Sequence, residues 1–300
     1  MPLWVPATVF AAAALLLRNA LQARLTPQIG TLGATMVRFV YGLPFVLVLH
    51  SGAMAVFGGA WPALTAPFLG PAAAGALCQI GGTALMLKAM HMRGFAVANA
   101  YIKMEPVLLA LGGWWLLGDV LAPLGWLGIV IATSGVLVAA IPAGMGLAGW
   151  RGQWGTISIG LLAAALFGFS AICFRAGVMA LGDGPALMRA LHMLLATIVI
   201  QASVMLVWLG LADRGGLRGS LVHWRIATLA GCAGALASMG WFTGFAMTAA
   251  ANVRTLALVE LPLAVLVNRP LTGKSPTRRE VAGIVLVMAG IMLLLRAELA

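Results

Sequence analysis

Long apolar stretches run through the whole chain, separated by short connections rich in glycine and proline. A stretch of about 18 or more residues with few charges predicts a membrane-spanning helix, because a bilayer core of about 30 Å takes about 20 residues at 1.5 Å each. The pattern predicts ten such helices. They cover residues 3–22, 30–50, 69–90, 95–117, 123–142, 154–176, 185–210, 224–248, 252–271 and 279–296.

Composition agrees with this pattern. Hydrophobic residues make up 62% of the 300 residues, charged residues only 8%, and the mean hydropathy is +1.05. A soluble domain has about half apolar and about a quarter charged residues. The sequence therefore predicts an all-α polytopic membrane protein that crosses the lipid bilayer several times.

The chain carries an internal repeat. When the sequence is shifted by 155 residues, Glu105 falls on Glu260, Gly128 on Gly283, and Gly135 on Gly290. Early helices match in the same way at a shift of 151 residues, which aligns Arg24 with Arg175. A period of this length indicates one five-helix unit written twice.

The two units predicted by the repeat are residues 1–150 and residues 151–300. Because five is odd, the second unit must enter the membrane in the opposite sense, as in inverted-repeat transporters. The charges of equivalent connections agree with inversion. The fourth connection holds no Lys or Arg, whereas its equivalent, the ninth, holds four: Arg269, Lys274, Arg278 and Arg279.

The formal charge of +11 is interpreted as an orientation signal. Lys and Arg concentrate in cytoplasmic connections, so the connections with Arg93, Arg218 and Lys274 are predicted to be cytoplasmic and both termini external. No basic run is interleaved with aromatic residues, so no nucleic-acid partner is expected. The GxxxxGK[ST] motif of ATP-binding loops does not occur, so no ATP is expected either.

Two ionisable residues interrupt the apolar stretch 95–117. Lys103 and Glu105 are two positions apart, so they point about 200° away from each other on a helix and cannot form an ion pair together. A charge at membrane depth is costly unless it is paired or hydrated, which favours a position facing the bundle interior or a watery cavity. Glu105 and its repeat equivalent Glu260 are therefore predicted to bind substrate or a proton.

Proline follows both glutamates closely, at Pro106 and Pro262. Proline removes a backbone donor and kinks a helix, and interrupted helices at matching positions of two repeats indicate a transporter site. The alternative is that both prolines only bend helices for packing.

Nearby polar and aromatic residues complete the predicted site. They share a helical face with these residues or lie at matching repeat positions: Asn99, Tyr101, Lys103, Gln79, Thr83, Ser238, Trp241, Arg24 and Arg175. Each also has a structural interpretation. The hydroxyl and amide groups can bond helix backbones, Trp241 can pack in the core, and the two arginines can reach the membrane surface.

The stretch "EPVLLALGGWWLLGDVLAPLGWLGIVIATSGVLV" resembles the end of an EamA repeat of the drug/metabolite transporter superfamily. In the second copy Lys274 stands where Asp119 stands in the first. The resemblance implies a ten-helix transporter of small metabolites, often an amino-acid or drug exporter, in the bacterial inner membrane. It also implies cytoplasmic termini, whereas the connection charges indicate external ones, and the two alternatives stay open.

We therefore expect a secondary transporter that moves an amino acid or a related amphipathic compound by alternating access, as an exporter and with possible proton coupling. No cofactor and no metal are expected, because the three cysteines lie in different predicted helices without metal-ligand spacing. The four histidines are scattered and no HExxH or GxSxG motif occurs, so an enzyme is not expected. The alternatives are a membrane-embedded enzyme without such a motif, or a channel or facilitator. A monomer and a homodimer are both open.

Overall fold

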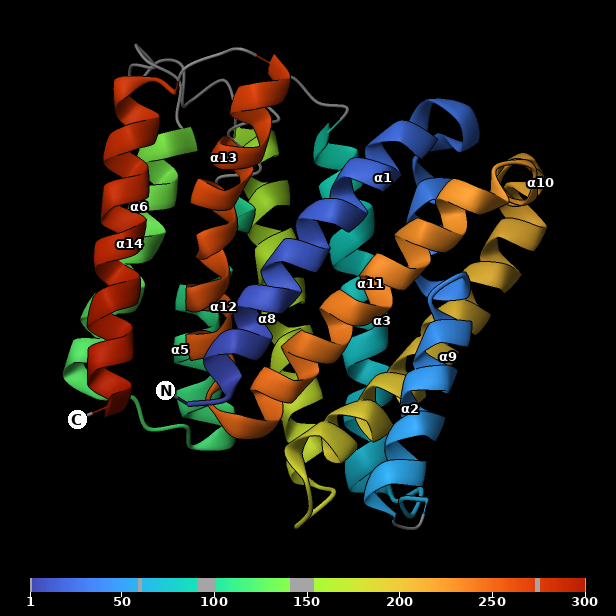
Figure 1. Ribbon diagram of the computed structural model, residues 1–300, viewed down its shortest axis with the longest axis horizontal. Helices are drawn as coiled ribbons and strands as arrows, with labels where there is room; N and C mark the ends of the chain where they lie inside the picture. The colour runs from blue at the N-terminus through green and yellow to red at the C-terminus, as the bar shows by residue number, and fades with distance from the viewer. Residues whose placement is uncertain (1, 59–60, 91–100, 141–153, 273–275, 300) are drawn as a thin grey trace. The chain divides into compact units, whose positions relative to one another are not determined.

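The structure of the protein is a computed structural model that describes residues 2–58, 61–90, 101–140, 154–272 and 276–299. Helices account for nearly all of these residues, and the described ranges contain no strand (Figure 1). Seven helical segments within them are long and apolar enough to cross a membrane, judged by length and composition. The prediction of an all-α protein with membrane-spanning helices is confirmed at this level.

The difference between seven segments and ten predicted crossings has three sources. Residues 4–57 count as one segment of 54 residues, which at 1.5 Å per residue is about 81 Å, far longer than one crossing. The prediction for 95–117 falls partly outside the described residues, and the prediction for 252–271 meets an interrupted helix. Ten crossings therefore stay a prediction.

The chain folds as two compact units, residues 1–80 with 173–248 and residues 81–172 with 249–300, referred to below as the first and second unit. Each unit draws on both halves of the sequence. The predicted repeat boundary at residues 150 and 151 lies outside the described residues.

The first unit is a helical bundle around two long helices. Its elements are α1 (Trp4–Val40), α2 (Leu43–Phe57), the first part of α3 (Ala66–Met90), the end of α8 (Trp154–Met179), α9 (Ala186–Ala212), α10 (Arg214–Val222) and α11 (Trp224–Met247). Helices α1 and α11 make the most extensive packing in this unit. They approach closely where Gly240 faces α1, since a Cβ there would lie 2.6 Å from the carbonyl oxygen of Ala7.

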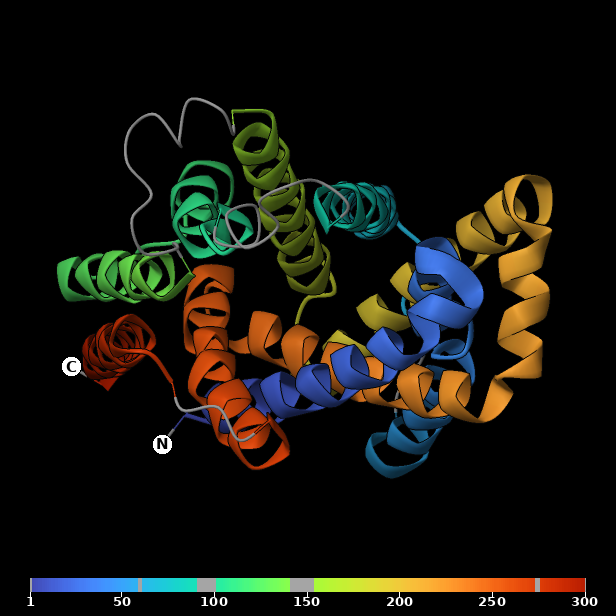
Figure 2. The same cartoon turned by 90° about the horizontal axis from the view of Figure 1, so that it is seen from above.

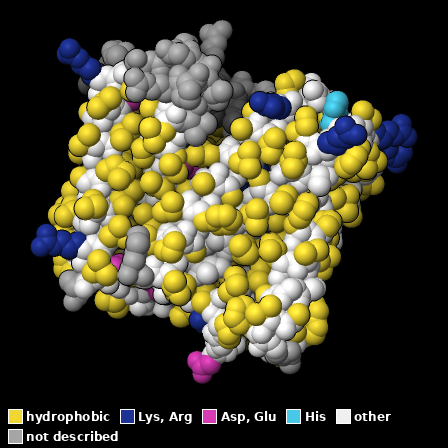
Figure 3. Space-filling model, in the orientation of Figure 1, with side chains coloured by type: hydrophobic (Ala, Val, Ile, Leu, Met, Phe, Trp, Pro, Cys, Tyr) yellow, Lys and Arg dark blue, Asp and Glu magenta, His cyan; other side chains and the backbone are white. Residues whose placement is uncertain are grey.

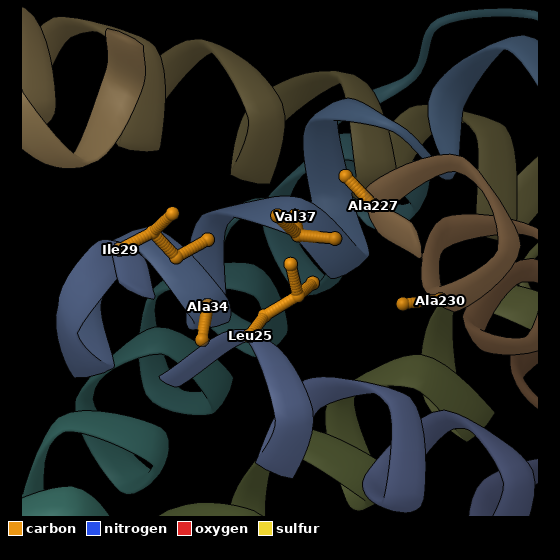
Figure 4. Close-up of a cluster of buried hydrophobic side chains, with 6 residues drawn as sticks. All are labelled: Leu25, Ile29, Ala34, Val37, Ala227 and Ala230. Atoms are coloured by element: carbon orange, nitrogen blue, oxygen red, sulfur yellow. The ribbon is translucent and has the colours of Figure 1, made fainter. Parts of the chain in front are cut away.

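Helix α1 is broken at Gly30. It contains residues 4–22 of the predicted helix 3–22 before the break and the start of the predicted helix 30–50 after it. Gly30 has φ 71° and ψ 169°, a conformation that glycine adopts without the steric cost that a Cβ brings. Residues on both sides of the break, Leu25 and Ile29 before it and Ala34 and Val37 after it, pack in one buried cluster with Ala227 and Ala230 of α11 (Figure 4). The break therefore folds two parts of α1 onto the same neighbour.

The second unit contains the rest of α3 and α8 together with α5 (Glu105–Leu117), α6 (Pro123–Ala140), α12 (Ala250–Leu256), the 3-10 turn η1 (Ala257–Val259), α13 (Glu260–Thr272) and α14 (Arg278–Leu299). Its most extensive packing joins α6 and α14, which lie side by side in both ribbon views (Figure 1 and Figure 2).

Glycines allow α6 and α14 to touch. A Cβ on Gly128 would lie 2.7 Å from the carbonyl oxygen of Gly290, and a Cβ on Gly135 would lie 2.6 Å from that of Gly283. Since Gly128 meets the later glycine of α14 and Gly135 the earlier one, the two helices run antiparallel. We call these four residues the glycine seam.

Apolar side chains cover most of the face shown in Figure 3. Each unit has strongly exposed apolar side chains, such as Leu211 (81% exposed) in the first and Trp115 (78% exposed) in the second. Soluble monomers rarely expose large contiguous apolar patches, so this surface suits a lipid environment.

Candidate functional site

Helix α5 begins at Glu105, the first of the two glutamates predicted to be functional. Residues 103 and 104 form a turn, Met104 occupies the N-cap position without a side-chain capping bond, and Pro106 lies within the first turn. Proline fits there because the first amide groups of a helix have no intrahelical acceptor. The helical conformation is therefore interrupted directly before Glu105.

Helix α13 begins in the same way at Glu260. The 3-10 turn η1 separates it from α12, and Pro262 lies two residues beyond the glutamate. Both carboxylates thus occupy the first turn of a helix, where the helix dipole stabilises negative charge. Both interrupted helices belong to the second unit.

Two ion pairs connect these helix starts. Lys103 Nζ pairs with Glu260 Oε1, and Arg254 Nε lies 3.1 Å from Glu105 Oε1. Each pair joins a residue of the first sequence half to one of the second. We call Lys103, Glu105, Arg254 and Glu260 the charge cluster.

The charge cluster is largely buried within an apolar unit. Both glutamate side chains are 14% exposed, Arg254 is 16% exposed and Lys103 is 30% exposed. An isolated buried charge costs several kcal/mol, and removing one partner of a buried pair costs about 3–5 kcal/mol. Two cations and two carboxylates give the cluster a formal charge of zero.

This arrangement can exchange partners. A carboxylate in a buried pair can accept hydrogen bonds from another cation, and a guanidinium or ammonium group can bind another carboxylate. A ligand with both charges can replace the internal pairs without leaving a buried charge uncompensated.

The remaining predicted residues of the second unit are Tyr101 and Thr83. Tyr101 is half-buried and helical, two residues before Lys103, and Thr83 is 3% exposed in α3. Asn99 lies outside the described residues.

Other predicted residues, Gln79, Ser238 and Trp241 among them, belong to the first unit. Gln201 Nε2 donates to Gln79 Oε1 at 2.7 Å, a buried contact between α9 and α3. Ser238 is half-buried in α11, and Trp241 on the same helix is 6% exposed.

Arg175 and Arg24 differ although they are repeat equivalents. Arg175 donates to the carbonyl oxygens of Phe245 (2.9 Å) and Thr248 at the end of α11. The helix dipole favours a cation at this C-terminal end. Arg24 is exposed on α1. Arg175 thus stabilises a helix end.

Arg254 was missing from the sequence-based site. It lies within the predicted helix 252–271 but was not named as a candidate, and the structure places it inside α12. A signal existed, because a shift of 155 residues aligns Arg254 with Asn99, which was a candidate residue. Arg254 is thus a cation at the repeat equivalent of a predicted site residue.

A histidine pair was also missed. His50 Nε2 and His192 Nδ1 are 2.8 Å apart, joining α2 to α9 in the first unit, and the ring of Trp61 lies 4.8 Å from that of His50. His50 is 1% exposed. Sequence spacing gives no hint of a contact between residues 142 positions apart. The described residues contain no group of three or more His, Cys, Asp or Glu side chains suited to a metal ion.

Comparison with known proteins identifies a fold. No protein-family model matches the sequence, and no curated protein matches it either. One solved structure, with the description "Crystal structure of protein", covers 98% of this chain and 98% of its own, with a TM-score of 0.73 and 18% sequence identity. A likeness at that identity establishes a shared fold and leaves function to be argued from the site.

Proposed function

We propose that this chain is a secondary transporter of a small metabolite. It has ten membrane helices in two inverted five-helix repeats and works by alternating access. The observation that carries the proposal is the charge cluster at two interrupted helices. In transporters of this architecture, substrate sites lie at discontinuous helices near the middle of the membrane, and half-helix N-termini point at anionic groups.

The glycine seam supports the inverted repeat. Gly283 and Gly290 are the repeat equivalents of Gly128 and Gly135. In the antiparallel pair, Gly128 contacts the equivalent of Gly135, and Gly135 contacts the equivalent of Gly128. A twofold axis produces this reciprocal contact pattern. Equivalent helices that run antiparallel are what an inverted five-helix repeat requires.

The charge cluster favours a substrate that carries both charges, with an amino acid as the simplest example. Its ammonium group would pair with Glu105 and its carboxylate with Arg254. The second pair, Lys103 with Glu260, would open or close as the interrupted helices move. Breaking a buried pair without replacement is costly, so the cluster would stay closed until the substrate compensates both charges.

The energy source in this proposal is a gradient of substrate or of an ion. Protonation of either glutamate would release its cation, which would couple proton movement to the pairs. Export across a bacterial inner membrane is the direction that the family resemblance suggests.

Counterflow in proteoliposomes tests the proposal. Vesicles loaded with unlabelled amino acid should accumulate labelled amino acid transiently and with saturable initial rates, because a carrier returns loaded faster than empty. A linear, unsaturated flux would indicate a channel, and no flux above empty liposomes for amino acids, amines, nucleosides and sugars would reject transport of these classes. Ligands for the assay can be chosen by thermal shift, since a ligand that binds the folded state raises its stability.

Membrane orientation is a separate part of the proposal. Connection charges predict that the region around Arg218 is cytoplasmic. Val222 and Leu64 are 75% and 73% exposed and lie in connections predicted to face opposite sides. In a background without Cys78, Cys173 and Cys232, cysteine at 64 should react with an impermeant thiol reagent in whole cells and cysteine at 222 should not. The reverse pattern would support cytoplasmic termini.

A further inference from the structure

Helix α10 presents two different faces, although it is only nine residues long. Gly216 and Ser220 are buried against the first unit, whereas Arg214 and Arg218, one turn apart, are exposed. Trp224 and Arg225 follow, with the guanidinium carbon of Arg225 5.6 Å from the centre of the Trp224 ring. Figure 3 shows Lys and Arg side chains gathered where Figure 1 labels α10.

The position of α10 is fixed by close packing. Asp213 Oδ1 accepts a hydrogen bond from the Gly216 amide at 2.9 Å and so caps the helix. A Cβ on Gly219 would lie 2.9 Å from Ile29 Cγ2, next to the break in α1. The arginines therefore project from an anchored element.

An apolar groove of about 410 Å³ lies beside α10. Its walls come from α1, α2, α9, α10 and α11, and include Met36, Tyr41, Phe45, Leu206 and Leu221. Tyr41 Oη and Ser220 Oγ are 3.3 Å apart, and Ser220 Oγ donates to the Leu217 carbonyl at 2.7 Å. These hydroxyls are thus bonded within the protein, and the walls offer an occupant chiefly hydrocarbon contacts.

We propose that α10 and this groove bind an anionic phospholipid. One acyl chain lies in the groove, and the phosphate lies against Arg214 and Arg218, with Arg225 at its edge. Guanidinium groups bind phosphate oxygens in bidentate geometry, and basic pockets beside membrane helices bind anionic headgroups. Charge complementarity favours this occupant, because three arginines lie within residues 213–225 and the carboxylate there, Asp213, is used by the helix cap.

This site needs only a membrane location and is independent of transport. An apolar partner protein would not explain three arginines within residues 213–225, the segment that supplies Leu217, Ser220 and Leu221 to the groove. A free phosphate would not explain the hydrocarbon walls. An exposed tryptophan beside the arginines is typical of the membrane interface, where its ring is amphipathic.

Lipid titration of the full chain in neutral detergent, followed by native mass spectrometry, tests the proposal. Phosphatidylglycerol should bind about tenfold more tightly than phosphatidylcholine with the same acyl chains. The double variant R214Q/R218Q should lose that preference. The matched variant R278Q/R279Q, which removes two exposed arginines from the start of α14, should keep it.

Two further arms separate headgroup from chain. Glycerol phosphate without acyl chains should show no measurable binding, and binding as tight as that of the lipid would overturn the proposal in favour of a free-phosphate site. Leu221→Asn should weaken both phospholipids alike, because it changes the groove and not the charge. Equal affinity for the two lipids, or equal loss in both arginine double variants, would also overturn the proposal.

The wild-type chain provides a test that does not depend on the variants folding. Phosphatidylglycerol with a photoreactive group in its acyl chain should crosslink to peptides from residues 36–45 and 206–228. Crosslinks spread over the apolar surface without enrichment there would contradict a specific groove site.

Discussion

The glycine seam and the charge cluster both join the two halves of the sequence within the second unit, but the seam follows the repeat symmetry and the ion pairs of the cluster do not. At the seam, Gly128 contacts Gly290, the repeat equivalent of Gly135, and Gly135 contacts the equivalent of Gly128. In the cluster the glutamates are equivalent, but their cations are not, because the equivalent of Arg254 is Asn99 and the equivalent of Lys103 is Leu258. Symmetric contact suits a fixed support, and asymmetric charge suits a site that distinguishes the two sides of a membrane.

The largest expected effect comes from removing one charge of the cluster. Lys103→Gln leaves Glu260 without its cation and should destabilise the protein by about 3 kcal/mol, at the low end of the range for buried pairs because Lys103 keeps 30% exposure. The double variant Lys103→Gln/Glu260→Gln should recover most of this stability, since neither charge remains. Thermal unfolding in detergent measures both, and a double variant as unstable as the single one would contradict the pairing.

Crowding the glycine seam should have the next largest effect. A Cβ at Gly290 would lie 2.4 Å from the Ala132 amide nitrogen, so Gly290→Ala must push α14 away from α6 and should cost about 1–3 kcal/mol. At Gly125 on α6 the nearest atom is 3.8 Å away, so Gly125→Ala serves as the matched control and should stay within about 0.5 kcal/mol. Similar unfolding temperatures for the two variants would show that the helices do not touch at the seam.

The smallest effect distinguishes a structural arginine from one in the charge cluster. Arg175→Gln removes a cation from the end of α11 and should cost about 1 kcal/mol while leaving the KM for transport unchanged. Arg24→Gln, at its exposed repeat equivalent, should change neither stability nor KM. A raised KM in the Arg175 variant would place that residue in the substrate path.

Sequence reasoning predicted the apolar helices and singled out Glu105 and Glu260 as charged residues within them, because both inferences follow from local rules. Apolar runs mark helices, and a carboxylate beside a proline in such a run is costly enough to stand out. The partners of Glu105 and His50 could not be predicted in the same way. Arg254 lies 149 positions from Glu105 by subtraction of their numbers, and only the packing of the folded chain brings residues that far apart into contact.

The conformation of α1 illustrates another limit. The sequence predicted a helix to residue 22 and another from residue 30, but helix α1 continues to the break at Gly30 and packs on α11 from both sides of it. Segments between apolar stretches can remain helical when their buried faces find a neighbour, because tertiary packing outweighs local preference. The same reasoning applies to α10, a nine-residue helix that lies within a stretch predicted to be a connection.

The central claim is that the Glu105 carboxylate takes part in transport. The most direct measurement is the initial counterflow rate of wild type, Glu105→Gln and the control Asp183→Asn, an exposed carboxylate in the turn between α8 and α9, in parallel proteoliposomes. Because Glu105→Gln leaves Arg254 without its ion-pair partner, the unfolding temperature of each variant in detergent is measured alongside the rate, which separates loss of transport from loss of folding. The account predicts that Glu105→Gln loses about tenfold or more in rate while it remains folded, and that Asp183→Asn behaves as wild type. Wild-type rates in Glu105→Gln would contradict it.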